Sequence, residues 1–490
     1  MQRLSVYGLA LALLGAACSS TAPGTEEATI GGIQPSAAQD APTAPGVAPS
    51  PLGSSAEGGA VVAPGEGVST GLPSSGAAGG APRTRDLGPP SQGVTKEAIK
   101  LGFWILDTTA VCANVGVDSG PCAGDDRAEV AAINDWMNAH GGIAGRRVDP
   151  VLVVQEVTRS NYSTMAQAAC EAFTEDHQVF AVVVASQFSR PDHVNCLAER
   201  NTPVVDAGTW AFDADDYARF AGFLYQPDRP RPERWVTAYV DGLARQGFFE
   251  KGSTIGLVRF DGASYTRVTE EVLKPRLAAH GFAVAEEAAI RTPESIAQYS
   301  DMNAEMNNAI LRFRNEGVDR VLFFATNQEL SFFFFKAADS QGFRPRYGLS
   351  SYDNPAFEES EAPGDQLNGA IGFGWAPRLD VAYERDPGGG RPVTRCGKIF
   401  ADAGLDPTRA RSEKCDNMFF LKAALDRAQA LNPLGLRLAV EGLGGAFKPA
   451  ATLTTRFDRG RYDGPATYRF LAFRQGCSCF RYTSGERAMP

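Results

Sequence analysis

The sequence lacks the short signatures of several common enzyme classes. It has no H-E-x-x-H or G-x-x-x-x-G-K-[ST] motif, and no G-x-S-x-G elbow between a predicted strand and a predicted helix. Histidine is scarce, and the four histidines lie without the spacing of metal ligands: His140, His177, His193 and His280. The glycine run 387–390 is not followed by a helix start, so it does not predict a phosphate-binding loop. We therefore expect no enzyme activity, no catalytic residues, no metal and no cofactor.

Positive charge and long apolar runs are also lacking. Lysine and arginine number 47 against 57 aspartates and glutamates, a net charge of −10, which argues against a nucleic-acid partner. The apolar run at residues 4–14 is too short to span a bilayer, and it stands between Arg3 and a small-residue stretch that ends at Cys18. This pattern predicts a signal peptide over residues 1–18. Its end, LLGAAC, is similar to a bacterial lipobox with Cys18 as the lipidated residue, and the alternative is an ordinary signal peptide cut at the same alanines.

Residues 19–94 contain almost no aromatic or periodic apolar positions and are rich in Gly, Ala, Pro, Ser and Thr. Such a composition cannot bury a core, so we expect a disordered tether. A flexible coil of about 75 residues has a root-mean-square reach of roughly 50 Å. An O-glycosylated stalk fits the same composition.

Cysteine usage predicts an oxidising compartment. Removing Cys18 from the nine cysteines leaves an even number, all of which can pair in a secreted protein. Proximity along the chain favours three pairs and leaves two cysteines in a C-S-C sequence, whose ring would be very tight. The expected pairs are Cys112 with Cys122, Cys170 with Cys196, Cys396 with Cys415, and Cys477 with Cys479.

From residue 95 onward the sequence alternates predicted strands and helices. Strands separated by helices predict an α/β fold with parallel sheets covered on both faces. The segment 225–235 contains three prolines, which exclude a continuous helix or a central strand, so we interpret it as the crossing into a second lobe. Predicted strands are 99–105, 148–154, 179–185 and 203–207, then 254–259, 283–289, 320–325 and 346–351; predicted helices are 127–139, 165–173 and 193–200, then 235–246, 267–281, 303–316 and 329–341.

Two sequence stretches resemble a known family. GVTKEAIKLGFWILDT at residues 93–108, and the spaced pattern IN…GGIAGRRV at residues 133–148, resemble substrate-binding lipoproteins of the branched-chain amino-acid type. The resemblance implies the periplasmic-binding-protein-like I fold, with two Rossmann-like lobes and parallel sheets joined by a multi-strand hinge. It also implies discontinuous lobes, residues 95–228 with 355–455 and residues 229–354 with 456–490.

Ligands of open parallel sheets lie beyond the carboxyl ends of the strands. Hydroxyl, amide, acidic and aromatic residues follow the predicted strands and could orient a small polar ligand. Capping of the next helix is the alternative role for Ser186, Thr326 and Asp353, and packing between lobes is the alternative for Trp210 and Tyr265. The candidate ligand-binding residues are Asp107, Thr108, Ser186, Gln187, Phe188, Thr209, Trp210, Asp261, Tyr265, Thr326, Asn327, Tyr352 and Asp353.

Amino-acid-binding relatives carry serines and small residues after the third strand, where this sequence has Gln187, Phe188 and Arg190. The difference is compatible with a bulkier or differently charged ligand. Four aspartates in one loop do not have the spacing of a calcium site, so we expect a solvated turn at Asp206, Asp213, Asp215 and Asp216.

The leading hypothesis is an extracytoplasmic solute-binding protein, held on the bacterial cell membrane by its lipid anchor. It would capture a small polar molecule, an amino acid or a related metabolite, by closing its lobes, and deliver it to the membrane permease of an ABC importer. The alternative hypothesis is a two-lobed sensory or protein-binding scaffold without a transport role.

Overall fold

A computed structural model describes residues 88–109, 124–158, 160–184, 190–208, 210–382, 391–408 and 412–490, with only the backbone of 296 and 391–394. Residues 86–490 belong to one compact unit. Several expectations lie outside the described residues: the signal peptide 1–18 with Cys18, the tether up to residue 87, Cys112, Cys122, Ser186, Gln187, Phe188 and Thr209.

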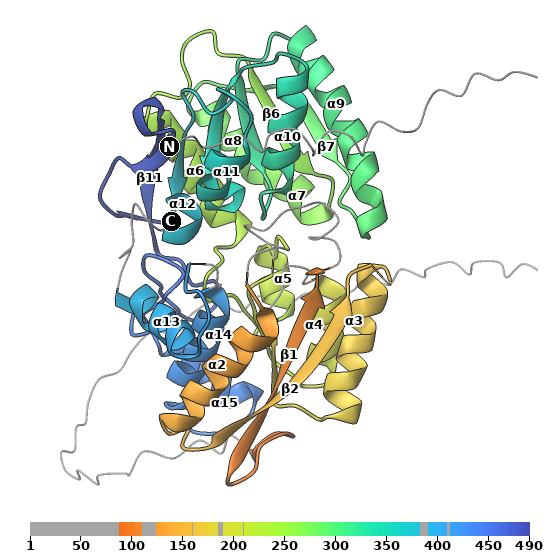
Figure 1. Ribbon diagram of the computed structural model, residues 1–490, viewed down its shortest axis with the longest axis vertical. Coiled ribbons are helices and arrows are strands. Elements are labelled where there is room, and N and C mark those ends of the chain that lie inside the picture. Colours follow the sequence, from red (N-terminus) through yellow and green to blue (C-terminus); the bar gives the residue numbers. More distant parts are fainter. Residues whose placement is uncertain are drawn as a thin grey trace, which may run out of the picture. The chain divides into compact units, whose positions relative to one another are not determined.

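The first sheet is entirely parallel and has the strand order β2-β1-β3-β4-β5. Its core contains apolar residues from early helices and from three helices late in the chain. The strands are β1 (Ala98–Asp107), β2 (Arg147–Glu156), β3 (Ala181–Val184), β4 (Val204–Asp206) and β5 (Leu224–Tyr225). The helices are α2 (Asp126–Ala139), α3 (Tyr162–Glu171), α4 (Pro191–Glu199), α5 (Ala214–Arg219), α13 (Arg391–Asp402), α14 (Ser412–Leu425) and α15 (Pro433–Glu441) (Figure 1). We call this part the first lobe.

Local sequence explains how α2 connects to β2. The Asp125 carboxylate caps the start of α2 by accepting hydrogen bonds from the two following backbone amides at positions 127 and 128. Gly142 follows the end of the helix with a φ of +67°, and a Cβ there would lie 1.8 Å from the Arg146 carbonyl oxygen. Only glycine fits this turn, which brings Val148 opposite Ile99 in the parallel register of β1 and β2.

The second sheet has the order β12-β11-β10-β9-β8-β6-β7. Strands β6 to β10 pair with one another in parallel, whereas β11 pairs antiparallel with β10 and β12 pairs antiparallel with β11. The strands are β6 (Ile255–Phe260), β7 (Val284–Ile290), β8 (Arg320–Phe324), β9 (Arg346–Ser350), β10 (Ile371–Gly374), β11 (Thr467–Arg474) and β12 (Cys479–Tyr482), with β13 (Arg487–Ala488) beside β11. The helices are α6 (Pro232–Arg245), α7 (Ala263–Val268), α8 (Lys274–Ala279), α9 (Tyr299–Asn315), α10 (Glu329–Ser340), α11 (Pro355–Glu361) and α12 (Pro377–Asp380) (Figure 1). We call this part the second lobe.

The discontinuous connection differs in position from the expected ranges. Strand β10 lies in the second sheet between β9 and β11, so the chain has not yet returned to the first lobe at residue 355. Residues of α13 are the next to join the first core, and Phe457 and Tyr462 still belong to it beyond residue 455. The expected boundary at residue 355 came from the family resemblance, and the local sequence of a short apolar strand does not tell in which sheet it pairs.

Three chain segments cross between the lobes side by side. The Gln226 amide donates to the Tyr462 carbonyl at 3.0 Å, and the Gly464 amide donates to the Gln226 carbonyl at 2.8 Å. The Leu453 amide donates to the Trp375 carbonyl at 2.9 Å. These bonds make the hinge a multi-stranded connection.

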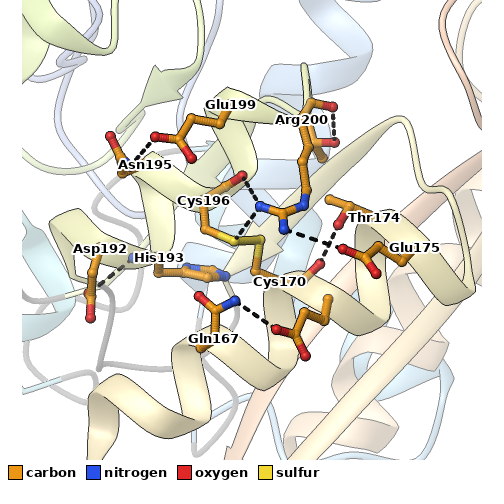
Figure 2. Close-up of a disulfide and its surroundings, with 12 residues drawn as sticks. Gln167, Cys170, Thr174, Glu175, Asp192, His193, Asn195, Cys196, Glu199 and Arg200 are labelled. Atoms are coloured by element: carbon orange, nitrogen blue, oxygen red, sulfur yellow. Dashed lines mark hydrogen bonds and ion pairs between the residues drawn. A yellow bond between two sulfur atoms is a disulfide. The ribbon is translucent and has the colours of Figure 1, made fainter.

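Disulfides link neighbouring elements within each lobe. Cys170 on α3 pairs with Cys196 on α4, and Cys396 on α13 pairs with Cys415 on α14. Figure 2 shows the first of these beneath Arg200, whose guanidinium lies 3.1 Å from the Cys196 sulfur and 3.3 Å from a Glu175 carboxylate oxygen. Cys477 and Cys479 also form a disulfide.

Candidate functional site

Charged and aromatic residues follow the carboxyl ends of strands in both sheets. In the first lobe, Tyr162 is the first residue of α3, and Arg190 is the N-cap of α4. In the second lobe, Tyr299 and Glu329 are the first residues of α9 and α10. With their neighbours they form what we call the junction cluster: Tyr162, Arg190 and Trp210 from the first lobe, and Tyr265, Glu294, Tyr299, Thr326 and Glu329 from the second.

Arg190 contacts both lobes. Its guanidinium carbon lies 5.4 Å from the ring centroid of Tyr162 and 5.1 Å from that of Trp210. Its Nη1 donates to Glu294 Oε1 at 2.7 Å, and its Nη2 donates to the Pro293 carbonyl at 3.0 Å. The Arg190 side chain is 10% exposed and that of Glu294 49%. A largely buried cation on the first lobe therefore holds the loop that follows β7 of the second.

The second-lobe part of the cluster contains an acid and paired hydroxyls. The hydroxyls of Tyr265 and Thr326 share a hydrogen bond of 2.7 Å, and the Tyr299 hydroxyl donates to Glu329 Oε1 at 2.7 Å. Burial raises the pKa of the Glu329 carboxyl. Burial also raises the pKa of Tyr162, the nearby Glu329 charge raises it further, and a hydrogen bond with Tyr299 and the charge of Arg190 act in the opposite direction. The junction thus combines one cation, two acids and several aromatic rings.

The structure brings together Trp210, Tyr265 and Thr326 of the candidate residues. The remaining described candidates near strand ends make local bonds. The Asp107 carboxylate accepts from the Thr109 amide at 3.0 Å and from Arg127 at 3.2 Å, and the bonds from Thr109 are the main reason that its pKa is lowered. Asp261 accepts from the amide and hydroxyl of Thr292, Asn327 accepts from the Glu329 amide, and Thr108 is half-buried after β1.

Tyr352 and Asp353 point into the second lobe. The Tyr352 ring lies 4.9 Å from that of Trp375, and the Tyr352 hydroxyl donates to the Pro230 carbonyl at 3.3 Å. The Asp353 carboxylate accepts from the Ser350 amide at 2.7 Å, and burial raises its pKa to about 7. In this conformation Tyr352 packs inside the second lobe and Asp353 acts as a cap. Capping is the alternative role that the sequence predicts for Asp353.

The acidic loop is only in part the solvated turn that the sequence predicts: Asp215 is exposed and Asp216 half-buried, whereas Asp206 and Asp213 are buried. Asp206 is fully buried, and its carboxylate accepts from Gln226 Nε2 at 2.6 Å and from the Gly208 amide. Asp213 is also buried and caps α5. It forms an ion pair of 2.9 Å with Arg267 of α7, and Arg267 also pairs with Glu233 of α6. This is a second ionic contact between the lobes, and it arises because tertiary packing covers Asp213.

Among the described residues, no group of three or more His, Cys, Asp or Glu side chains is placed to hold a metal ion.

Sequence reasoning missed Tyr162, Glu294, Tyr299 and Glu329, and it mentioned Arg190 only as a departure from the relatives. One signal was available. Three of the missed residues begin the α-helix that follows a predicted strand, on the side where a parallel sheet presents its ligand-binding edge.

Comparisons with solved structures show the same two-lobed fold. A branched-chain amino acid ABC transporter protein from Thermus thermophilus with bound valine superposes with a TM-score of 0.59 at 17% identity, covering 80% of this chain and 97% of that one. An ABC transporter substrate-binding protein from Desulfitobacterium hafniense in complex with leucine gives a TM-score of 0.53 at 14% identity, covering 79% and 100%. A substrate-binding protein from Aeropyrum pernix gives 0.59 at 13% identity, covering 81% and 97%. At these identities the similarity establishes the fold.

No curated protein matches the chain. Across the described residues, every helix is too short or too polar to cross a membrane. The family model described as periplasmic binding protein matches residues 113–475, which is more than half of the sequence. The chain therefore belongs to the periplasmic binding protein family and has the periplasmic-binding-protein-like I fold, as the sequence resemblance predicts.

Proposed function

We propose that this periplasmic binding protein captures a small polar ligand, an amino acid or a related metabolite, between its two lobes and delivers it to the permease of an ABC importer. The junction cluster is the observation that supports this most. It collects a cation, two acids and aromatic rings from the strand ends of both sheets, so a molecule bound there touches both lobes. Structures of the same fold are described with bound valine and leucine.

The proposed mechanism is hinge closure. A ligand that contacts both lobes stabilises the closed state by its differential affinity for that state over the open one. The ionic contacts of Arg190 with Glu294 and of Arg267 with Asp213 exist only when the lobes meet, so they add to closure independently of the ligand. The permease would then distinguish the closed protein from the open one.

Family membership implies a location outside the cytoplasm, and the finer proposal is attachment to the cell membrane through a lipid on Cys18. The supporting observation is the LLGAAC sequence at the end of a short apolar run. Replacing Cys18 with serine should move the protein from the membrane fraction to the soluble extracytoplasmic fraction. A variant that stays in the membrane fraction contradicts the anchor.

Ligand capture can be tested without knowing the ligand. Native mass spectrometry of protein purified from its own host should show a bound small molecule. A thermal-shift screen with amino acids, amides, short-chain acids and aromatic metabolites should then raise the Tm by about 4 °C at a ligand concentration one hundred times the Kd.

Trp210→Ala should abolish this shift, because Trp210 lies in the junction cluster. The matched control is Trp136→Ala, since Trp136 stacks on His140 at 3.9 Å within the first lobe. A folded protein that neither carries nor binds any of these molecules would count against the proposal.

One observation favours a second candidate, a two-lobed sensory or protein-binding scaffold. Both terminal nitrogens of Arg190 already bond to second-lobe groups, so the lobes hold together through their own side chains. Co-purification of a protein partner with no small molecule, together with genes that lack a neighbouring permease, would support this candidate.

A further inference from the structure

The hairpin of β11 and β12 carries a disulfide at its tip. Cys477 ends a short 3-10 turn, Ser478 adopts a left-handed φ of 47°, and Cys479 begins β12. Only Ser478 separates the two cysteines. Cys477 is exposed, whereas Cys479 is fully buried. The two sulfurs of one bond therefore differ sharply in access to solvent.

The other two described disulfides are interior. Cys170 and Cys196 lie in the core of the first lobe, where Arg200 and Glu175 cover them (Figure 2). Cys396 and Cys415 belong to the same core. Their cysteines are separated by 26 and 19 positions, against 2 for Cys477 and Cys479.

Exposure makes the hairpin disulfide the most accessible of the three to an external thiol. An attacking thiolate must reach a sulfur atom, so the rate of exchange depends on access. Cys477 is exposed, whereas the cysteines of the other two described disulfides lie in the core of the first lobe.

The fold around the hairpin does not depend on the bond. Residues 471–474 pair with residues 479–482 in antiparallel register. Phe480 is fully buried, and its backbone amide donates to a Glu359 carboxylate oxygen at 2.9 Å. These contacts keep the two cysteines close together after reduction, which allows the bond to form again.

We propose that Cys477 and Cys479 form a thiol–disulfide exchange site, in which Cys477 meets the external thiol and Cys479 resolves the intermediate. A thiolate attacks the exposed Cys477 sulfur, a mixed disulfide forms there, and Cys479 leaves as a thiolate. A second thiol of the reductant then attacks the mixed disulfide, which frees Cys477 and oxidises the reductant to its own disulfide. Without that second thiol, Cys479 attacks Cys477 and releases the first thiol. The partner class is a thiol, either a small molecule or a protein dithiol.

A reduction time course of the full chain tests this site. The protein is incubated with reduced glutathione, and samples taken at increasing times are quenched with acid, alkylated and mapped by peptide mass spectrometry. Cys477 and Cys479 should become alkylated while the other two described pairs are still oxidised, with the circular dichroism spectrum unchanged, because only the hairpin disulfide exposes a sulfur-bearing residue to the thiol. Reduction of all three pairs together with loss of structure would overturn the proposal.

A trapping experiment distinguishes the two thiol sources. The oxidised protein is mixed either with reduced glutathione or with a thioredoxin-type protein whose second active-site cysteine is serine. An adduct on Cys477 in the glutathione mixture identifies a small thiol as the partner. An adduct on Cys477 in the thioredoxin-type mixture identifies a protein dithiol. The double variant Cys477→Ser, Cys479→Ser should form neither and keep the wild-type Tm. An adduct on Cys479, or no adduct in either mixture, refutes the assigned roles.

Discussion

Replacing Arg190 with alanine should shift the lobes toward the open state. Arg190 is anchored on the first lobe by the rings of Tyr162 and Trp210, and both rings stay with it when the lobes separate. Its bonds to Glu294 and to the Pro293 carbonyl reach the second lobe and are lost on opening. These two bonds are the direct contacts of Arg190 that differ between the closed and open states, and its charge also acts on Glu329 of the second lobe.

Their combined contribution can be estimated. An ion pair whose acid is half exposed contributes about 0.5 to 1 kcal/mol. A hydrogen bond from a charged donor to a buried carbonyl adds about 1.5 kcal/mol. The total of about 2 kcal/mol corresponds to a change of roughly 30-fold in the ratio of closed to open protein. Arg190→Lys keeps the charge but not the second bond, so its ratio should change about tenfold.

Single-molecule fluorescence transfer measures this ratio without a ligand. Dyes are placed through non-canonical residues at Asp135 on the first lobe and Glu316 on the second, both of which are exposed. Arg200→Ala is the matched control, because Arg200 pairs with Glu175 inside the first lobe. The control should leave the ratio of closed to open protein unchanged. Any ligand found later should bind Arg190→Ala with a lower affinity than the wild type, reduced by the same factor as the fraction of closed protein.

Equal distance distributions for the wild type and Arg190→Ala would refute this reasoning. They would mean that water replaces both bonds at no cost, or that the lobes are held together by other contacts. A shift of the same size in Arg200→Ala would show that the effect is loss of stability and not loss of a contact between lobes.

Three further predictions concern the stability of the fold. Burial raises the pKa of Asp380 to about 7, so the stability that its protonated form provides is fully present at acidic pH and is lost as the pH rises to 7; Asp380→Asn should flatten the decline of Tm between about pH 4 and pH 7, and an unchanged pH profile would contradict this. Lys414 is 2% exposed and pairs with Glu129 at 2.7 Å, so Lys414→Met should cost about 3 kcal/mol in urea unfolding, and adding Glu129→Gln should recover part of that loss. Replacing Cys170 and Cys196 with alanine should lower the free energy of unfolding by about 3 kcal/mol, and a loss below about 1 kcal/mol would show that this disulfide adds little.

Expected elements in both lobes agree closely with the observed ones. The strand predicted at 320–325 is β8 (Arg320–Phe324), and the helix predicted at 329–341 is α10 (Glu329–Ser340). Such agreement is possible because the spacing of apolar residues, the glycines of turns and the runs of β-branched residues are local properties of the sequence.

The candidate site was harder to predict from the sequence. Tyr352 and Trp210 both follow a strand, yet the Tyr352 ring packs against Trp375 inside the second lobe.

The alternation of strands and helices, the proline-rich crossing and the family could be predicted from the amino-acid sequence, because each depends on residues close together in the chain. Three features became clear only in the folded protein: β10 lies in the second sheet, Asp206 and Asp213 are buried, and Arg190 reaches Glu294. Arg190 and Glu294 are distant in sequence, and their contact depends on how two separately folded lobes meet. Local patterns carry no information about that meeting.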